Sequence, residues 1–344
     1  MKAAIYHEPM KITTEDVPMP KIGDMDILVK VHACGICGSD LHMYRLGVFA
    51  EGLCRPSEGG MIPGHEFSGE VAEVGKDVSG ISVGDRVSAL TFGGMAEYVP
   101  VSPAYLGINV YKIPDGVNWV EAATTEPLAN SLHATKLGNP ADGQNVVIFG
   151  AGIIGLGIVQ SLKVTGVKLN KIIMVDVSDK RLQMAKDLGA DDVINAGKED
   201  VYQRCIDLTG EVPVTILAGA MTSPDVHVVY DCVGYIQERP EPPVLQQVML
   251  IAREYGKVVV HGAFEAPVTL EMMPLVAKHV QVLGSYGFVI QEDGARALEL
   301  MRDKKVDRMK IVTHVFPIEK AKEAFDIQCQ VDNSIKVVVT PINN

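Results

Sequence analysis

The stretch NVVIFGAGIIG, residues 145–155, joins a short apolar run to three glycines spaced as G-x-G-x-x-G. The apolar run is typical of a buried strand, and the residues after it continue at helical spacing. In a strand–turn–helix unit, Gly150 makes the tight turn and Gly152 lets an anionic ligand approach the backbone. Gly155 lets the helix pack closely on the strand. The stretch therefore predicts a dinucleotide-binding turn, with the pyrophosphate at the helix N-terminus.

Strand-like and helical segments alternate after this turn. Apolar runs at 171–176, 191–196, 226–234, 257–264 and 280–288 are separated by helical patterns at 178–189, 201–210 and 244–256. This alternation indicates a doubly wound, six-stranded parallel sheet with helices on both faces. We therefore expect an α/β cofactor-binding domain over residues 121–289. Residues 211–225 are too long for an ordinary connection, so they predict either extra structure or an interface loop.

The candidate cofactor-binding residues lie where these strands end. Asp176 ends the second strand, and a carboxylate there accepts hydrogen bonds from ribose hydroxyls and repels a 2′-phosphate. This favours NAD over NADP, although Lys180 and Arg181 lie close by in the sequence and could pair with a phosphate. A tightly packed turn without a ligand is the alternative. The predicted set is Gly150, Gly152, Ile153, Ile154, Gly155, Asp176, Arg181, Cys232 and Gly262.

Residues 1–120 have a β-rich pattern instead. Short alternating runs such as ILVKVHA and GDRVSAL are separated by Gly and Pro, as antiparallel strands in a barrel-like domain require. Residues 290–344 return to strands with one helix. We expect them to join the first segment in one discontinuous domain, 1–120 and 290–344, which we take to be the catalytic one.

Composition limits the possible partners. The 344 residues carry a net charge of −12, and a field of that sign repels nucleic-acid phosphates. No apolar run approaches the roughly 18 residues that a membrane span needs. The six cysteines are dispersed, and the chain does not open with a leader-like segment. These features predict a cytoplasmic protein with free thiols that acts on a small molecule.

Four residues outside the predicted sheet are candidate metal ligands. They are Cys37 in CGICGSDLH, His65 and Glu66 in PGHEFSG, and Glu126 in TEPLANSLHA. Zinc prefers sulfur, nitrogen and oxygen ligands, and a catalytic zinc keeps one coordination position open. A Cys/His/Glu set supplies three ligands and leaves that position free. The residues are too far apart for a zinc knuckle, so only the tertiary fold can bring them together.

The order of the motifs supports this interpretation. CGICGSDLH, PGHEFSGEV, VGDRV, AEYV, EPLANSLHA, the glycine turn and GSYGF follow one another along the chain. Together they resemble the zinc-dependent medium-chain alcohol dehydrogenases, especially the sorbitol and L-threonine dehydrogenase branches, nearly end to end. The resemblance implies a GroES-like catalytic domain with a Rossmann domain, and hydride transfer from a secondary alcohol to NAD, giving the ketone. Sugar alcohols, sugar phosphates, diols, cyclic alcohols and amino alcohols all remain candidate substrates.

The resemblance also implies a metal centre with one catalytic zinc per chain. Cys37 and His65 would bind the zinc. Glu66 also binds it in the sorbitol branch, while Glu126 binds it directly or holds a metal-bound water, with exchange between the two. Asp40 would accept a hydrogen bond from the zinc-bound imidazole and fix its tautomer.

Ser39, His42 and Glu126 are the predicted catalytic residues. Ser39 would take the hydroxyl proton, and His42 would pass it to solvent through the nicotinamide ribose, a task that suits an imidazole. For each nearby aromatic residue, core packing is at least as good an explanation as a role in the substrate pocket. The pocket candidates are Tyr44, Phe49, Phe92 and Tyr286, with Phe288 as a weaker one. The loop 45–61 is either a specificity lid or a solvated connection.

The chain departs from the family pattern in two ways. Only SALTFGGM separates Val87 from Ala96, and no cysteine lies between Cys54 and Cys205, so we expect no structural zinc lobe. Gly287 stands where sorbitol dehydrogenases place a substrate arginine, and the histidine that usually follows Gly-Asp-Arg-Val in L-threonine dehydrogenases is missing. These departures disfavour both a sorbitol-type polyol and threonine as the substrate.

Two other functions remain open. A zinc-free, NADPH-dependent quinone or enone reductase of the same fold would lack the Cys/His/Glu set. A non-catalytic nucleotide-binding protein would not need Ser39 and His42, and both are present. The resemblance further implies a homodimer or homotetramer, formed through sheet edges near residues 280–288.

Overall fold

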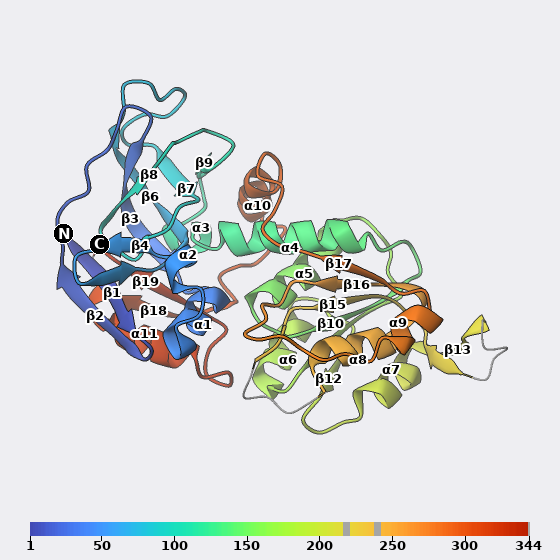
Figure 1. Cartoon of the computed structure of the whole chain (residues 1–344). Coiled ribbons are helices and arrows are strands. Elements are labelled where there is room, and N and C mark those ends of the chain that lie inside the picture. The colour runs from blue at the N-terminus through green and yellow to red at the C-terminus, as the bar shows by residue number, and fades with distance from the viewer. Residues whose placement is uncertain (216–220, 237–241, 343–344) are drawn as a thin grey trace. The chain divides into compact units, whose positions relative to one another are not determined.

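The computed structural model describes residues 1–215, 221–236 and 242–342, and the chain divides into two compact units (Figure 1). The first unit comprises Met1–Ala129 with Val289–Asn344, and the second comprises Asn130–Phe288. The first break falls later than the sequence predicted, at 129 rather than 120. Glu126 therefore belongs to the first unit, together with the other candidate metal ligands.

The second unit is built on a parallel sheet of six strands. These are β10 (Asn145–Phe149), β11 (Lys171–Asp176), β12 (Asp192–Asn195), β15 (Val226–Asp231), β16 (Ala252–Val260) and β17 (Gln281–Gly284). Their order is β12-β11-β10-β15-β16-β17, and every neighbouring pair is parallel. The order reverses between β10 and β15, and open sheets of this kind bind ligands at the carboxyl ends of the strands at that point.

Helices cover this sheet, as the sequence predicted (Figure 1). They are α5 (Ile153–Val164), α6 (Asp179–Asp187), α7 (Val201–Thr209), α8 (Val244–Ile251) and α9 (Met273–Ala277), with α4 (Thr125–Gly138) leading into the unit. Buried Val, Ile and Phe side chains of the strands form the core with apolar residues of α7 and α8. Within residues 211–225, β13 (Glu211–Pro213) pairs with β14 (Thr222–Pro224), so this stretch carries extra structure, although 216–220 lie outside the described residues.

The predicted helix over VLQQVMLIAREYG is wrong in its second half. Helix α8 ends at Ile251, and AREYG begins strand β16. The Lys278 Nζ donates hydrogen bonds to the carbonyl oxygens of Met249, Leu250 and Ala252, at 2.8, 2.7 and 2.5 Å. A cation at these carbonyls stabilises a helix end, and it comes from a residue distant in sequence. The local pattern could not have predicted this end.

The first unit contains two sheets. One has four strands in the order β2-β1-β5-β4, namely β1 (Lys2–Glu8), β2 (Lys11–Asp16), β4 (Arg55–Ser57) and β5 (Gly60–Ile62). The other has seven strands, namely β3 (Ile27–Gly35), β6 (Glu66–Val74), β7 (Arg86–Ala89), β8 (Tyr98–Val101), β9 (Val110–Lys112), β18 (Val312–Pro317) and β19 (Lys336–Thr340). Its order is β18-β19-β3-β6-β7-β9, with β8 also on β3. Strand β19 thus joins the tail of the chain to the first segment, as the sequence predicted.

Short helices complete the first unit. They are α1 (Gly38–Leu46), α2 (Ala50–Leu53), α3 (Trp119–Ala122), α10 (Asp293–Arg302), the 3₁₀ turn η2 (Ile318–Lys320) and α11 (Ala321–Gln328). Apolar side chains from β3, β6, β19 and α11 form one continuous core. No helix among the described residues is long and apolar enough to cross a membrane.

Candidate functional site

Three strands meet at Gly35, the last residue of β3. Gly35 pairs with Glu66 of β6 on one side and with Val338 of β19 on the other. A Cβ at Gly35 would lie 2.5 Å from Glu66 Oε2 and 2.8 Å from Lys336 Cε. The glycine therefore leaves the space in which the side chains of Glu66 and Lys336 meet.

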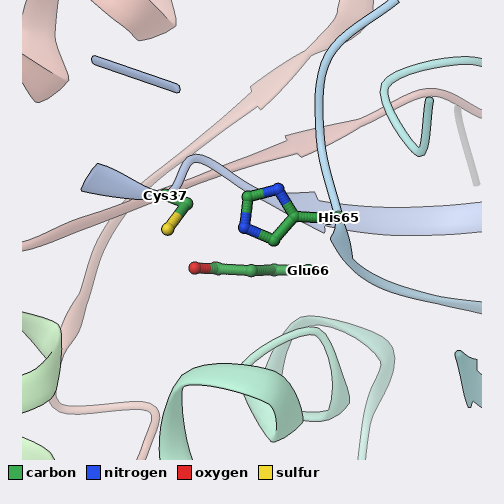
Figure 2. A group of neighbouring side chains, drawn as sticks. All are labelled: Cys37, His65 and Glu66. Atoms are coloured by element: carbon green, nitrogen blue, oxygen red, sulfur yellow. The ribbon is translucent and has the colours of Figure 1, made fainter. Parts of the chain in front are cut away.

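The candidate metal ligands converge beside this point (Figure 2). Cys37 follows β3 and is the N-cap of α1, while His65 stands immediately before β6. Gly64, with φ of 93°, makes the turn into His65. One ligand atom each from Cys37, His65 and Glu66 lies within 4.8 Å of the others, so one ion could contact all three. The tertiary fold thus brings these three predicted ligands together.

The charges of this cluster act strongly on each other. Burial raises the pKa of the Cys37 thiol, and the negative charge of Glu66 raises it further. Burial alone would lower the pKa of His65, but the interactions with Cys37 and the negative charges of Asp40 and Glu126 together outweigh it, so this pKa lies well above its usual value. The cluster therefore concentrates negative charge around one imidazole. A divalent cation would neutralise that charge.

Two buried cations balance Glu66. The Lys336 ammonium forms an ion pair with Glu66 Oε2, and both side chains are fully buried. The Lys336 Nζ also donates a hydrogen bond to the Ile36 carbonyl oxygen at 2.7 Å. Arg308 is buried as well; burial lowers its pKa to about 10, while the charges of Glu66 and Glu121 oppose that shift. The sequence interpretation missed both cations, although a lysine opening the apolar run KVVV was a signal.

The polar atoms around the cluster fit a metal ion. Beyond the ion pair with Lys336, neither Glu66 oxygen accepts a hydrogen bond, and His65 Nδ1 has no partner among the described residues. Buried polar atoms normally have partners, so these atoms require an explanation. Thiolate, imidazole and carboxylate are the ligands that zinc prefers, which makes this cluster a good fit for zinc.

Asp40 lies beside the cluster but makes a different contact from the expected one. Its Oδ2 accepts a hydrogen bond from the Cys37 backbone N–H at 2.9 Å, and its Oδ1 is buried without a partner. No hydrogen bond joins Asp40 to the His65 ring in the described structure, so the predicted role in fixing the imidazole tautomer is not seen. Burial raises the pKa of Asp40, while the charge of His65 opposes that shift. Asp40 therefore fixes the backbone of the cysteine rather than the histidine ring.

Glu126 lies near the cluster without belonging to the three-ligand group. It is in the first turn of α4, and its negative charge raises the pKa of both Cys37 and His65. Electrostatic contact with two ligands places its carboxylate close to them. The group that the structure assembles uses Glu66 as its carboxylate.

The predicted proton-relay residues share one helix. Ser39 and His42 lie three residues apart in α1, so they are neighbours on its surface. Ser39 Oγ is buried and has no hydrogen-bond partner among the described residues. His42 is half-buried, and its ring lies 6.0 Å from that of Phe49, edge to face. The arrangement leaves the serine hydroxyl available to a ligand.

Two of the aromatic pocket candidates flank the site histidines. Phe49 packs edge to face against His42, and Phe92 packs the same way against His65, with ring centroids 5.8 Å apart. Phe49 and Phe92 are 43% and 39% exposed, respectively, so part of each ring is accessible. Both can therefore contact a bound substrate.

Tyr44 and Tyr286 are placed differently from the predicted pocket. Tyr44 is fully buried in the core, where its ring packs on Phe325 and its hydroxyl donates to Asp326 Oδ1 at 2.7 Å. The periodicity of α1 turns Tyr44 inward, so its prediction as a pocket residue is wrong. Tyr286 is 94% exposed, and the weaker candidate Phe288 is half-buried.

The glycine turn of the second unit has the geometry that its sequence predicts. Gly150 has φ of 94°, in the left-handed region that favours glycine. A Cβ at Gly155 would lie 1.9 Å from the Gly150 carbonyl oxygen, which shows how closely helix and strand approach. No atom lies within 4 Å of the position that a Cβ at Gly152 would take. This open space at the start of α5 is where a pyrophosphate could approach.

A cavity of about 360 Å³ opens at the carboxyl ends of β10, β11 and β15. Gly150 and Asp176 line it, together with Val177, Ala196 and Gly234. Asp176 Oδ2 accepts a hydrogen bond from the Ala151 N–H at 2.7 Å, which fixes the carboxylate beside the glycine turn. The cavity lies where the strand order reverses, as expected for a dinucleotide.

The other predicted cofactor-binding residues lie outside the lining of this cavity. Ile153 and Ile154 are half-buried in the first turn of α5, and Arg181 is half-buried in α6. The Cys232 N–H donates to the Phe149 carbonyl oxygen at 2.9 Å, and the Gly262 N–H donates to the Asp231 carbonyl oxygen at 2.9 Å. Their roles in cofactor binding remain predictions.

Comparisons with known proteins agree with these geometries. Residues 23–115 match the family model of the alcohol dehydrogenase GroES-like domain, and residues 154–303 match that of zinc-binding dehydrogenases. The chain is 31% identical to an L-idonate 5-dehydrogenase of Vitis vinifera, over 93% of this chain and 89% of the relative. It is 30% identical to a sorbitol dehydrogenase of Bombyx mori, over 94% of each.

A solved structure also matches nearly the whole chain. The 2R,3R-butanediol dehydrogenase of Bacillus subtilis has a TM-score of 0.78 and 27% identity, and the match covers 99% of both chains. The matched domains, the relatives and the Cys/His/Glu cluster all agree. The chain therefore belongs to the zinc-dependent medium-chain alcohol dehydrogenase family.

Proposed function

We propose that this protein oxidises a secondary alcohol group of a small substrate to a ketone and transfers the hydride to NAD. The proposal rests on the cluster of Cys37, His65 and Glu66, whose ligand atoms lie within 4.8 Å of one another. Relatives named for idonate, sorbitol and butanediol support a substrate with more than one hydroxyl group. One zinc ion per chain is the cofactor that the three-ligand set implies.

The residues in and around the cluster have separate roles in the proposed reaction. A zinc ion held by Cys37, His65 and Glu66 would supply a Lewis acid that favours the ionised form of an alcohol. Ser39 Oγ is buried and has no partner in the described parts of the chain, so it can accept the hydroxyl proton of the substrate. His42, one turn further along α1, would receive that proton and release it to solvent.

Two aromatic side chains assist this step. Phe49 and Phe92 cover the edges of the two histidine rings with apolar surface. Apolar cover excludes water, which strengthens electrostatic interactions at the reacting hydroxyl.

Asp176 supports the choice of NAD. Its carboxylate lines the cavity beside the glycine turn, where the adenosine ribose of a dinucleotide would bind. A negative charge at this point repels a 2′-phosphate, so NADP is disfavoured. A homodimer or homotetramer in the cytoplasm remains a prediction from the family resemblance.

Metal analysis combined with an alcohol panel tests the proposal. We expect about one zinc per chain, and oxidation of secondary alcohols with NAD in preference to NADP. Cys37→Ser should lose the metal and lower turnover roughly 1000-fold, because several kcal/mol of transition-state stabilisation disappear. Cys329→Ser, at a half-buried cysteine in α11's C-cap, is the matched control and should keep metal and turnover.

The opposite results would overturn the function. Freshly purified protein without a transition metal, whose alcohol oxidation is not restored by zinc, would exclude a zinc dehydrogenase. Reduction of quinones or enones with NADPH by the same material would favour the metal-free alternative.

A further inference from the structure

Arg55 is a half-buried cation with two fully buried donor atoms. It is the first residue of β4, and its Nε and Nη2 atoms are inaccessible to solvent and form no hydrogen bond within the described residues. Burial lowers the pKa of Arg55, and no carboxylate offsets that effect. A guanidinium still keeps its charge at neutral pH. Buried donors that are left unpaired destabilise a fold, so these two donors require a partner that the described residues do not supply.

The strand register places Arg55 near the metal cluster. Arg55 pairs with Ile62 across the hairpin of β4 and β5, and Ile62 stands three residues before His65. Side chains that pair across a hairpin project from the same face of the sheet. Arg55 therefore lies beside Ile62, the last residue of β5, the strand that leads into the metal-binding histidine.

A second contact places the Arg55 side chain against Gly93, next to the residue that packs on His65. A Cβ at Gly93 would lie 2.6 Å from Arg55 Nε, so the arginine side chain lies directly on the Gly93 backbone. The Gly93 N–H donates to the carbonyl oxygen of Gly64, the residue before His65, at 2.9 Å. Phe92, which precedes Gly93, packs edge to face on the His65 ring. Arg55 and His65 thus contact adjacent residues of one segment, Gly93 and Phe92 respectively.

Within the described parts of the chain, no acidic side chain pairs with this guanidinium. Glu51 and Glu58 flank Arg55 in sequence, and both are exposed and form no ion pair with it. A Cβ at Gly93 would clash with the arginine and would also be strained, because φ is 94° there. Glycine at position 93 keeps the space for the arginine side chain.

We propose that Arg55 binds an anionic group of the substrate, a carboxylate or a phosphate, and so selects acidic polyols over neutral ones. This inference rests on the proposed oxidation of an alcohol at the adjacent cluster. A guanidinium presents two parallel N–H donors that match a carboxylate or a phosphate, and the pairing is strong when water is excluded. The anion would satisfy the donors that are otherwise buried without a partner. Arg55 is thus a specificity residue of the substrate site.

Three matched substrates test this inference. The kcat/KM is measured for a hexitol, the corresponding hexonate and the hexitol phosphate, in the unmodified protein and in Arg55→Gln. We expect one of the two anions to be preferred over the hexitol, and Arg55→Gln to lower its kcat/KM by about 10- to 100-fold, mainly through KM. Whichever anion shows the larger loss identifies the group that Arg55 binds. Arg55→Lys should retain part of the preference, since it keeps the charge without the paired donors.

Matched controls separate binding from folding. Arg296→Gln removes an exposed arginine of α10 that pairs with Glu299, and it should leave the anion preference unchanged. Arg55→Gln should not lower the Tm of the ligand-free protein, because it removes a half-buried cation whose buried donors have no partner among the described residues. A structural arginine would show the opposite, a clear fall in Tm.

Calorimetry gives a result that does not depend on turnover. Titration of the zinc-loaded protein with hexonate and with hexitol phosphate should show weaker binding in Arg55→Gln than in the unmodified protein. Equal binding in both would overturn the role of Arg55 and leave the alcohol oxidation standing. If no alcohol is oxidised, the proposed function falls, yet the calorimetric comparison still decides whether Arg55 binds anions.

Discussion

The glycine turn of the second unit and the metal-ligand cluster of the first unit are both built where strands end, but by different means. The turn uses contiguous residues and depends on side chains that are missing, as at Gly152 and Gly155. The cluster uses segments far apart in the chain and depends on buried charges that must balance, as in Glu66 and Lys336. An added side chain in the glycine turn should disturb helix packing or the approach of the ligand. Removal of one charge from the cluster should lower the stability of the protein.

Lys336→Met should have the largest effect among the variants that test this difference. Removing the ammonium leaves Glu66 buried without its contacting counter-ion, so the metal-free protein should lose about 3–5 kcal/mol of stability. The loss should be smaller in the zinc-loaded protein, because the metal then supplies positive charge to Glu66. Urea unfolding with a chelator and with added zinc measures both values.

The control for this variant is an exposed lysine. Lys322→Met breaks the pair of Lys322 with Asp326 on α11, and it should change stability by less than about 1 kcal/mol. An equal loss in the metal-free and zinc-loaded forms of Lys336→Met would show that the lysine acts through packing alone.

The glycine turn is tested by a matched pair of alanine variants. Gly155→Ala places a Cβ 1.9 Å from a backbone oxygen, so the second unit should lose about 3 kcal/mol of stability. The Cβ of Gly152→Ala meets no atom within 4 Å. The free energy of unfolding of this variant should therefore differ from that of the unmodified protein by less than about 1 kcal/mol. Its Kd for NADH should nevertheless rise at least about tenfold, since the new methyl group enters the pyrophosphate space.

Thermal unfolding and a fluorescence titration with NADH separate these two effects. If Gly152→Ala bound NADH as tightly as the unmodified protein does, the open space at the start of α5 would not be the pyrophosphate site.

The smallest expected effect is a change of stability with pH. It concerns His261, whose pKa is shifted in the opposite direction to that of His65. Negative charge raises the pKa of His65, whereas burial beside His133 lowers the pKa of His261 to about 4. Ser285, whose hydroxyl lies 3.1 Å from His261 Nδ1, brings no charge. In the unfolded chain an imidazole has a pKa near 6.5, so the unfolded state binds more protons between pH 6.5 and 4. Stability is therefore lost as pH falls through this window.

His261→Gln should remove that loss. From pH 6.5 to 5, protonation of His261 in the unfolded state should lower the free energy of unfolding of the unmodified protein by about 2 kcal/mol. This contribution should be absent in the variant. Urea midpoints at the two pH values give the difference. Parallel pH profiles for the two proteins would contradict the depressed pKa of His261.

The same contrast explains what the sequence could predict. The turn around Gly150, the six-stranded parallel sheet and the candidate ligands Cys37 and His65 follow from local patterns or from the order of motifs. The counter-ion Lys336 and the unpaired Arg55 depend on which distant residues meet in the folded chain, and periodicity carries no such information. The same reason applies to the end of α8, which Lys278 fixes from another segment.

The position of Lys336 in the last strand has a consequence for biosynthesis. Strand β19 inserts between β18 and β3, so the lysine reaches Glu66 only after the residues up to 336 have left the ribosome. Contacts between residues so far apart in sequence form late and slowly. Until then the glutamate carries its charge in a half-built sheet, where water or an early-bound zinc ion would have to stabilise it. Zinc supply during translation should therefore influence the yield of folded enzyme.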